Sequence, residues 1–339
     1  MTTAALDLAS HFINRSTPLT RARSVLYRYP AISPALVLVA AVVVFGVINP
    51  RFIAPANLSL ITQQVAVIGT LGVAETLVIL TAGIDLSVGA AMVLSSVTSA
   101  GLVASTGLPG IVALAIGVLV GLATGALNGV LVTRLHLPPF IVTLGTLSVF
   151  TALSLLASNG ATVQGTELPG LVIATGDTIG ILGVQVTYGV LLMVLLYLTL
   201  WFTLSRTAWG RHVYAVGDDK EAARLTGIRV NRVLLSVYLT AGVIVGLAAW
   251  IQIGRDFGSS PNAATDANLN AITAVVIGGT SLFGGRGNVW GTLLGALIVG
   301  VFRNGLSLAG LDVLYQNLAV GVLVIAAVSV DQWIRKARN

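Results

Sequence analysis

The sequence predicts an all-α, polytopic transmembrane helix bundle of about ten spans, and three observations support this fold class. Of the 339 residues, 56% are hydrophobic and only 9% are charged, whereas a soluble domain carries about 25% charged residues. The hydrophobic residues form long runs, and about 20 such residues cross a bilayer as a helix. The prolines lie at the ends of these runs or in loops, where a missing backbone N–H costs little.

Ten apolar segments are expected to span the membrane within a transmembrane domain at 31–330, between polar tails at 1–30 and 331–339. The first segment is too long for the apolar core of a typical signal peptide, so it is expected to remain uncleaved. The eighth and ninth are short and rich in glycine, and they are expected to be broken or re-entrant, which would reduce the count to eight. The segments are 31–48, 60–81, 88–105, 110–132, 140–158, 187–204, 233–254, 268–283, 288–302 and 312–330.

The distribution of basic residues predicts the orientation of the chain. With ten spans and a cytoplasmic N-terminus, fifteen of the 18 Lys and Arg residues fall in cytoplasmic segments and three in external ones. Cytoplasmic loops of membrane proteins carry an excess of Lys and Arg, so both termini are expected to be cytoplasmic. The basic residues are scattered between apolar runs rather than gathered into a stripe, so a nucleic-acid partner is not expected.

The longest external segment is expected at 159–186. Its apolar run can form short strands or an interfacial helix. Two interpretations remain open for this loop: a cap over the bundle, or a docking surface for an external partner.

Charge is dense only in the segment 206–232, which is expected to be a cytoplasmic loop. Asp218 can cap a short helix, and Glu221, three residues later, can complete a capping box. Gly227 suits the left-handed residue after the helix. A short amphipathic helix of this kind, at 219–225, is marginal on its own. We therefore expect it to dock into a partner.

Several chemistries have no signature in the chain. No lysine follows a glycine, so there is no phosphate-binding Gly-Lys-Ser/Thr loop. The three histidines are far apart without ligand spacing. Ser87 and Ser281 lie among glycines but in neither case with the spacing of a nucleophile elbow. The chain is therefore expected to be neither an enzyme nor a holder of a metal or other cofactor.

Polar residues inside the apolar segments are few: Gln63, Gln64, Glu75, Asp85, Asn128, Asn270 and Asn304. Carboxyl groups in a membrane are a functional hypothesis by default. For Glu75, a hydrogen bond that helps helices to pack is the favoured interpretation. For Asp85, an N-cap at the start of the third span is favoured. The many glycines predict close contacts between helices.

Four stretches of the sequence, one of which contains a short loop motif, resemble a known family. Glu221-Ala222-Ala223 followed by Gly227 resembles the EAA loop of ABC-importer permeases. The stretches 75–90, 128–146, 210–228 and 274–298 resemble the ribose/xylose-type sugar permeases. The four segments in this order are specific for the family and less so for its sugar. The resemblance extends from about residue 31 to the C-terminus.

The resemblance implies an importer subunit of a bacterial cytoplasmic membrane. Such permeases pair, usually as homodimers, and sit on two cytoplasmic ATPase subunits, while an external or periplasmic binding protein delivers a monosaccharide. The coupling contacts to the ATPase would involve Asp219, Glu221, Ala222, Ala223 and Gly227. A pentose, a hexose and the furanosyl signal autoinducer-2 remain open as substrates.

Gln63, Asn128 and Asn304 are candidate residues of the substrate pathway. Uncharged polar groups can bind sugar hydroxyls without the cost of a buried charge. The alternative function is an ATP-independent secondary transporter or channel, in which Glu75 and Asp85 would be proton or cation sites.

Overall fold

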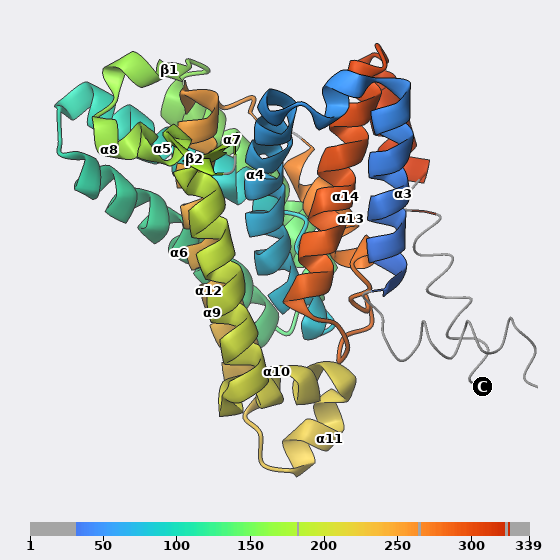
Figure 1. Ribbon diagram of the computed structural model, residues 1–339. Helices are drawn as coiled ribbons and strands as arrows, with labels where there is room; N and C mark the ends of the chain where they lie inside the picture. Colours follow the sequence, from blue (N-terminus) through green and yellow to red (C-terminus); the bar gives the residue numbers. More distant parts are fainter. Residues whose placement is uncertain (1–31, 182, 264–265, 323–324, 326–339) are drawn as a thin grey trace, which may run out of the picture.

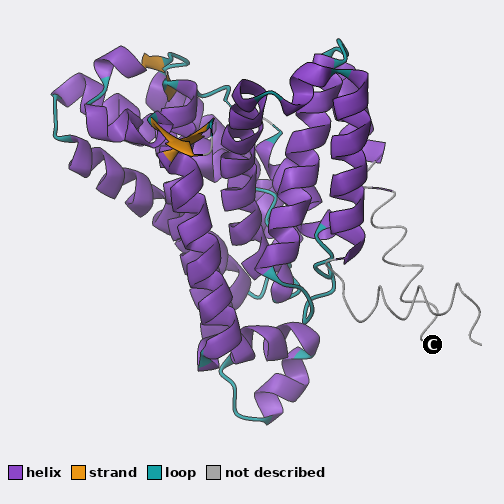
Figure 2. Cartoon of the chain, viewed as in Figure 1, coloured by secondary structure: helices purple, strands orange, loops and turns teal. Residues whose placement is uncertain are grey.

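The computed structural model describes residues 32–181, 183–263, 266–322 and 325, and within them the chain is a bundle of helices (Figure 1). The predicted tails at 1–30 and 331–339 lie outside the described residues. The strands among the described residues form two small antiparallel pairs (Figure 2). The all-α, polytopic fold class predicted from the sequence is confirmed.

Seven helices in the described part are long and apolar enough to cross a membrane. Three shorter apolar helices accompany them: α3 (Ile32–Ile48), α13 (Ala267–Ile277) and Val313–Val322. Each of the ten expected spans therefore corresponds to one helix, although only part of the last one is described. The seven are α4 (Pro55–Leu80), α5 (Val88–Thr106), α6 (Gly110–Arg134), α7 (Pro139–Ser158), α9 (Tyr188–Arg206), α12 (Val230–Asp256) and α14 (Val289–Leu308).

The extents predicted for the eighth and ninth spans are wrong. Helix α13 ends at Ile277, and the glycine-rich residues 278–288 form turns and loop rather than a continuation of the helix. Helix α14 is a full-length helix of 20 residues rather than a short one. The two helices come into close backbone contact where α13 ends. A Cβ on Gly278 would overlap the backbone of Gly291.

Helix α4 lies at the centre of the bundle, between α12, α13 and α14 (Figure 1). Almost all of its residues from Val65 to Leu80 are buried. A helix that is apolar on every face is expected in such a position, where no face meets water.

The predicted close contacts between glycine-bearing helices are confirmed at α6 and α12. A Cβ on Gly125 would overlap the carbonyl oxygen of Tyr238, and one on Gly121 would overlap that of Gly242. Small residues let helix backbones approach in this way.

The two ends of the bundle carry different structures. The expected short strands are present at one end, in the hairpin of β2 (Thr178–Ile181) and β3 (Val184–Thr187) and in the pair of β1 (Val163–Gln164) with β4 (Gly258–Ser259). Figure 1 shows α10 and α11 at the opposite end. The remaining short elements are η1 (Pro50–Ile53), η2 (Gly165–Glu167), α8 (Gly170–Ile173), η3 (Ala174–Gly176), α10 (Ala208–Asp218) and α11 (Lys220–Leu225).

The loops 159–186 and 206–232 lie at opposite ends of the bundle (Figure 1), and this leads to a labelling prediction. The chain has no cysteine, so single cysteines can be introduced by Gly170→Cys and Asp219→Cys. We expect an impermeant thiol reagent added to intact cells to label position 170, where an added side chain meets open space. Position 219 should react only after the cells are permeabilised. The reverse pattern would contradict the predicted orientation.

Candidate functional site

The charged loop 206–232 contains two helices, of which the sequence analysis expected only α11. Helix α10 begins after Thr207, whose side chain accepts a hydrogen bond from the Gly210 N–H at 3.2 Å. Val213 and Val216 are three residues apart and both fully buried. A threonine cap followed by apolar residues at helical spacing is the signal that would have revealed α10.

The cap of α11 differs from the prediction. Asp218 ends α10, and Asp219 is the N-cap: its carboxylate accepts hydrogen bonds from the Glu221 and Ala222 N–H groups at 2.9 and 3.0 Å. Glu221 is thereby the second residue of the helix. A capping box needs the acidic residue at the third position, so the predicted box does not form.

The end of α11 agrees with the prediction for Gly227, which has a φ of +86°. The Gly227 N–H donates to the Arg224 carbonyl at 3.0 Å, and the Ile228 N–H donates to the Ala223 carbonyl at 3.1 Å. These bonds satisfy carbonyl groups that the helix end leaves free. A Cβ at Gly227 would meet no atom, so the requirement for glycine there is conformational.

Both polar and apolar side chains of α11 are exposed to solvent. Of the predicted coupling residues, Ala223 is buried, while Asp219, Glu221, Ala222 and Gly227 are exposed. Leu225, which the sequence analysis did not select, is 87% exposed. No ion pair within the described residues involves the segment 206–232. Leu225 and the charged groups beside it therefore face solvent.

Helix α10 contacts the end of the central helix through backbone atoms. Gly217 lies against the carbonyl group of Leu80, the last residue of α4, and a Cβ at Gly217 would overlap that oxygen. The same oxygen accepts a hydrogen bond from the Gly285 N–H at 3.0 Å. The end of α4, the end of α10 and the glycine-rich loop 278–288 therefore meet at one point. We call this contact the Leu80 junction.

Two aromatic side chains hold α10 in this position. The Tyr214 hydroxyl donates to the Gly287 carbonyl at 2.9 Å, and the Trp209 indole N–H donates to the Ser236 hydroxyl on α12 at 2.7 Å. Burial raises the pKa of Tyr214, so its hydroxyl remains a donor at neutral pH. The loop 278–288 and α12 are thereby both tied to α10.

Asn304, one of the predicted pathway residues, is buried against α4. Its amide pairs with that of Asn57: Asn57 Nδ2 donates to Asn304 Oδ1 at 2.8 Å, and Asn304 Nδ2 donates to Asn57 Oδ1 at 2.9 Å. Asn57 also donates to the Phe52 carbonyl at 2.7 Å. This pair links α14 to the start of α4.

Asn128, the second predicted pathway residue, belongs to a separate buried group. Its Nδ2 donates to the Ser87 hydroxyl at 2.9 Å and to Asp85 Oδ2 at 3.3 Å, and its Oδ1 accepts from the Thr146 hydroxyl at 2.8 Å. Glu75 lies in the same group. Its Oε1 accepts from the Asp85 N–H at 3.1 Å. The Glu75 carboxyl thus forms a hydrogen bond inside the bundle, as the sequence favoured. Its partner lies in the turn 81–87 rather than on a neighbouring helix.

The N-cap predicted at Asp85 is wrong. Helix α5 begins at Val88 and its N-cap residue is Ser87. The Asp85 carboxylate accepts instead from the Ser87 N–H at 2.8 Å and from the Ser87 hydroxyl at 2.6 Å. These bonds stabilise the turn 81–87 that precedes the helix.

Gln63, the third predicted pathway residue, is half-buried on α4. Its Nε2 donates to the Ser59 hydroxyl at 3.1 Å, and the Ser59 hydroxyl donates to the Gln185 carbonyl in β3. Each of the three predicted pathway residues therefore belongs to a different hydrogen-bonded group. Gln63 alone among them is not fully enclosed by protein.

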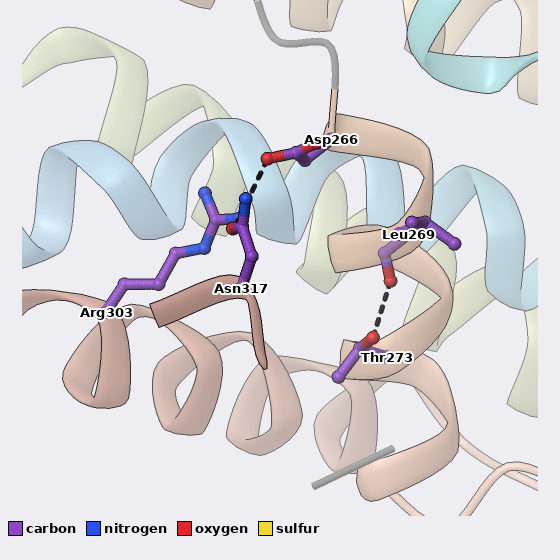
Figure 3. Close-up of polar contacts among 5 residues, drawn as sticks. All are labelled: Asp266, Leu269, Thr273, Arg303 and Asn317. Carbon is purple, nitrogen blue, oxygen red and sulfur yellow. Dashed lines mark hydrogen bonds and ion pairs between the residues drawn. The ribbon is translucent and has the colours of Figure 1, made fainter. Parts of the chain in front are cut away.

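A further polar contact joins α13 to its neighbours. The Arg303 guanidinium on α14 lies 3.4 Å from the Asp266 carboxylate before α13 and 3.1 Å from Asn317 Oδ1, as Figure 3 shows. In the same view the Thr273 hydroxyl bonds to the Leu269 carbonyl one turn earlier in α13. Arg303 holds the start of the short helix against α14. The described residues contain no group of three or more His, Cys, Asp or Glu that could hold a metal ion.

Comparisons with known proteins find similarity to permease proteins of transport systems. A family model described as the permease component of branched-chain amino acid transport systems matches residues 57–328. A fructose import permease of Rhizobium meliloti is 48% identical over 337 residues, 98% of this chain and 94% of that protein. A ribose import permease of Bacillus subtilis is 39% identical, covering 89% of this chain and 92% of its own. A D-allose transport system permease of Escherichia coli is 37% identical, covering 88% and 91%.

The Asn57–Asn304 pair leads to a prediction about stability. Asn304→Ala leaves a buried amide without its partner, which should lower the free energy of unfolding by about 1–3 kcal/mol. The double variant Asn57→Ala/Asn304→Ala should lose less than the sum of the single variants. Thermal unfolding of the detergent-solubilised chain measures both. Gln63→Ala is the matched control, since its amide is half-buried. Additive losses at positions 57 and 304 would contradict the pairing.

Proposed function

The chain belongs to the family of permease components of branched-chain amino acid type transport systems, and we propose that it is the membrane-spanning permease subunit of a binding-protein-dependent ABC importer for a monosaccharide. In this proposal the chain lies in a bacterial cytoplasmic membrane with both termini inside. It has no ATP site of its own. A separate ATPase drives alternating access of the sugar pathway.

The alignment of nearly the whole chain with sugar permeases carries this proposal, and the apolar bundle of many helices agrees with it. The family model spans 57–328, and three relatives whose names specify fructose, ribose and D-allose import each align over at least 88% of the chain. The higher identity to the fructose permease, 48% against 39% and 37%, makes fructose the first sugar to test. The ribose and D-allose permeases are also 39% and 37% identical to this chain, so pentoses and other hexoses remain competing substrates.

We propose that α11 is the surface that receives the ATPase. It lies at the end of the bundle away from the β2–β3 hairpin (Figure 1), and its exposed residues include Glu221, Ala222 and Leu225. Ala222 is small enough to let a second surface approach. Leu225 offers an apolar side chain for that surface to bury, and fully burying a leucine contributes about 1.5–3 kcal/mol.

The opposite end of the bundle is the proposed docking surface for the sugar-binding protein. The hairpin and α8 present exposed apolar side chains there, including Leu171, Ile179 and Ile181. A second copy of the permease is proposed to complete the pathway, as the family resemblance implies. The exposed leucines along α7 and α9, such as Leu156 and Leu195, suit contact with lipid or with that copy.

Uptake experiments distinguish this proposal from a secondary transporter. The chain is expressed with its ATPase and binding protein in cells that lack sugar import, and uptake of labelled fructose, ribose and allose is followed. We expect uptake of one of these sugars to need both partners and to persist when a protonophore collapses the proton gradient while ATP is maintained. Uptake that survives removal of the ATPase and stops with the protonophore would favour the secondary transporter.

The exposed leucine on α11 gives a prediction for coupling. Leu225→Ser removes an apolar anchor without disturbing the buried face of α11, so sugar-stimulated ATP hydrolysis by the assembled complex should fall about tenfold. Uptake should fall with it, while abundance in the membrane stays at the wild-type level. Leu135→Ser is the matched control, because Leu135 is 60% exposed just after α6 and lies outside the loop. Wild-type hydrolysis in Leu225→Ser would remove α11 from the coupling surface.

Gln63, Asn128 and Asn304 remain the proposed pathway residues, and Gln63 gives the cleanest test of this role. Asn128 and Asn304 hold other parts of the bundle together, so their substitution changes stability as well as transport. Gln63→Ala should lower uptake several-fold at unchanged abundance, because a lost hydrogen bond to a sugar hydroxyl costs about 1 kcal/mol. Uptake by this variant at the wild-type rate would exclude Gln63 from the pathway.

A further inference from the structure

A small buried cavity lies between α4, the turn 81–87, α6 and α12. It measures about 10 Å³, which is at the lower limit of the space that holds one water molecule. The polar groups that line it are Glu75, Asp85, Ser87, Asn128 and Tyr238, with Thr124 beside them. Glu75 and Tyr238 are at most 1% exposed. Asn128, a proposed pathway residue, also lines this cavity, whereas the unpartnered groups described below have no role in the sugar pathway or the ATPase surface proposed above.

The two carboxyl groups at the cavity differ in how many hydrogen bonds they accept. Asp85 accepts three: two from Ser87 at 2.6 and 2.8 Å, and a longer one of 3.3 Å from Asn128. Glu75 accepts one, from the Asp85 N–H at 3.1 Å. Its other oxygen, Oε2, has no partner within the described structure, and the same is true of the Tyr238 hydroxyl. Both unpartnered atoms belong to side chains that line the cavity.

No cationic side chain balances these carboxyl groups. The cavity lining contributed by α4, α5, α6, α12 and the turn contains no Lys, Arg or His, and Thr146 of α7, which bonds to Asn128, is neutral. Two nearby carboxylates without a counter-charge cannot both remain ionised in a dry interior. Hydrogen bonds donated to a carboxylate favour its charged form, so the three donors at Asp85 assign the charge to Asp85 and the proton to Glu75.

We propose that this cavity is a binding site for one water molecule, which is held between the protonated Oε2 of Glu75 and the hydroxyl of Tyr238. The protonated Glu75 carboxyl donates a hydrogen bond to the water oxygen, and the water donates a hydrogen bond to the Tyr238 oxygen. The water supplies partners for both buried groups that otherwise lack one, which removes the cost of leaving them unsatisfied.

A metal cation fits the cavity less well than water. Divalent cations such as Mg²⁺ and Ca²⁺ take six or more oxygen ligands. Only two oxygen-bearing side chains here have an atom without a partner. A monovalent cation is the competing occupant, and the experiment below is designed to detect it.

Infrared spectroscopy of the purified chain in lipid nanodiscs tests the location of the proton. At neutral pH we expect a C=O stretching band from a protonated carboxyl group in the wild type. Glu75→Gln should abolish this band and Asp85→Asn should retain it. The band should also persist in the control Glu167→Gln, which changes an exposed carboxylate at the far end of the bundle. A wild-type spectrum without the band, or a band that survives Glu75→Gln, would overturn the assignment.

Thermal unfolding of the same variants tests the site without relying on transport. Glutamine can donate to the same water from its amide, so Glu75→Gln should melt within about 2 °C of the wild type. Asp85→Asn replaces a charged acceptor of three hydrogen bonds and should melt about 5 °C lower or more. Equal, large losses in both variants would mean that Glu75 is charged and would contradict the proposal.

The occupant is identified by two further measurements. A cryo-EM map of the assembled transporter that shows ordered water should contain one peak between Glu75 and Tyr238, and an empty cavity would contradict the proposal. Melting temperatures in sodium chloride and in choline chloride should agree at equal ionic strength. Stabilisation by sodium that Glu75→Gln removes would identify a cation site instead. The infrared and melting readouts need neither sugar nor ATPase, so their failure is distinguishable from failure of the proposed transport function.

Discussion

Helix α4 is enclosed by other helices along most of its length, and its polar groups must therefore find partners inside the protein. Bulk water does not reach its buried stretch, and an unsatisfied polar group at membrane depth costs several kcal/mol. Three polar groups on α4 each fix another segment: Asn57 fixes α14, Ser59 fixes β3, and Glu75 fixes the turn 81–87. The arrangement of the bundle around its central helix follows from this requirement together with the packing of apolar side chains.

Glycine sets how closely the other helices approach one another. The contacts of α6 with α12, of α13 with α14, and of α10 with α4 all bring backbone atoms to positions that a Cβ would occupy. In lipid, helices gain little from burying apolar surface against each other, so packing at short distance supplies much of the association energy. Close backbone contacts also leave little freedom to slide. We infer that movements within the bundle occur at loops and helix ends rather than along these helix pairs.

The sequence predicts the helices well because each span is a run of apolar residues bounded by local signals. It fails where a local signal is overlooked and where structure depends on distant contacts. The eighth span was expected to extend to residue 283, but α13 stops at Ile277, directly before Gly278 and Gly279, a local stop signal that the expected bounds overlooked. Asp218 and Asp219 are equally good caps by type, and the choice of Asp219 depends on where α10 ends. Asn128 and Asn304 stand out in the sequence as polar residues within apolar spans, and their place in the substrate pathway stays a prediction. Their partners Ser87 and Asn57 lie 41 and 247 positions away, beyond any local pattern.

The Leu80 junction relates the proposed coupling surface to the centre of the bundle. The Leu80 carbonyl lies against Gly217 and accepts a hydrogen bond from Gly285, so α10 cannot move relative to α4 without displacing the loop 278–288 or breaking that bond. Tyr214 ties the same loop to α10. A displacement applied to α11 would therefore reach the end of α4 and the loop that follows α13 together. In the proposed importer, movement driven by ATP would enter the membrane domain at this point, through backbone contacts that transmit force without depending on flexible side chains.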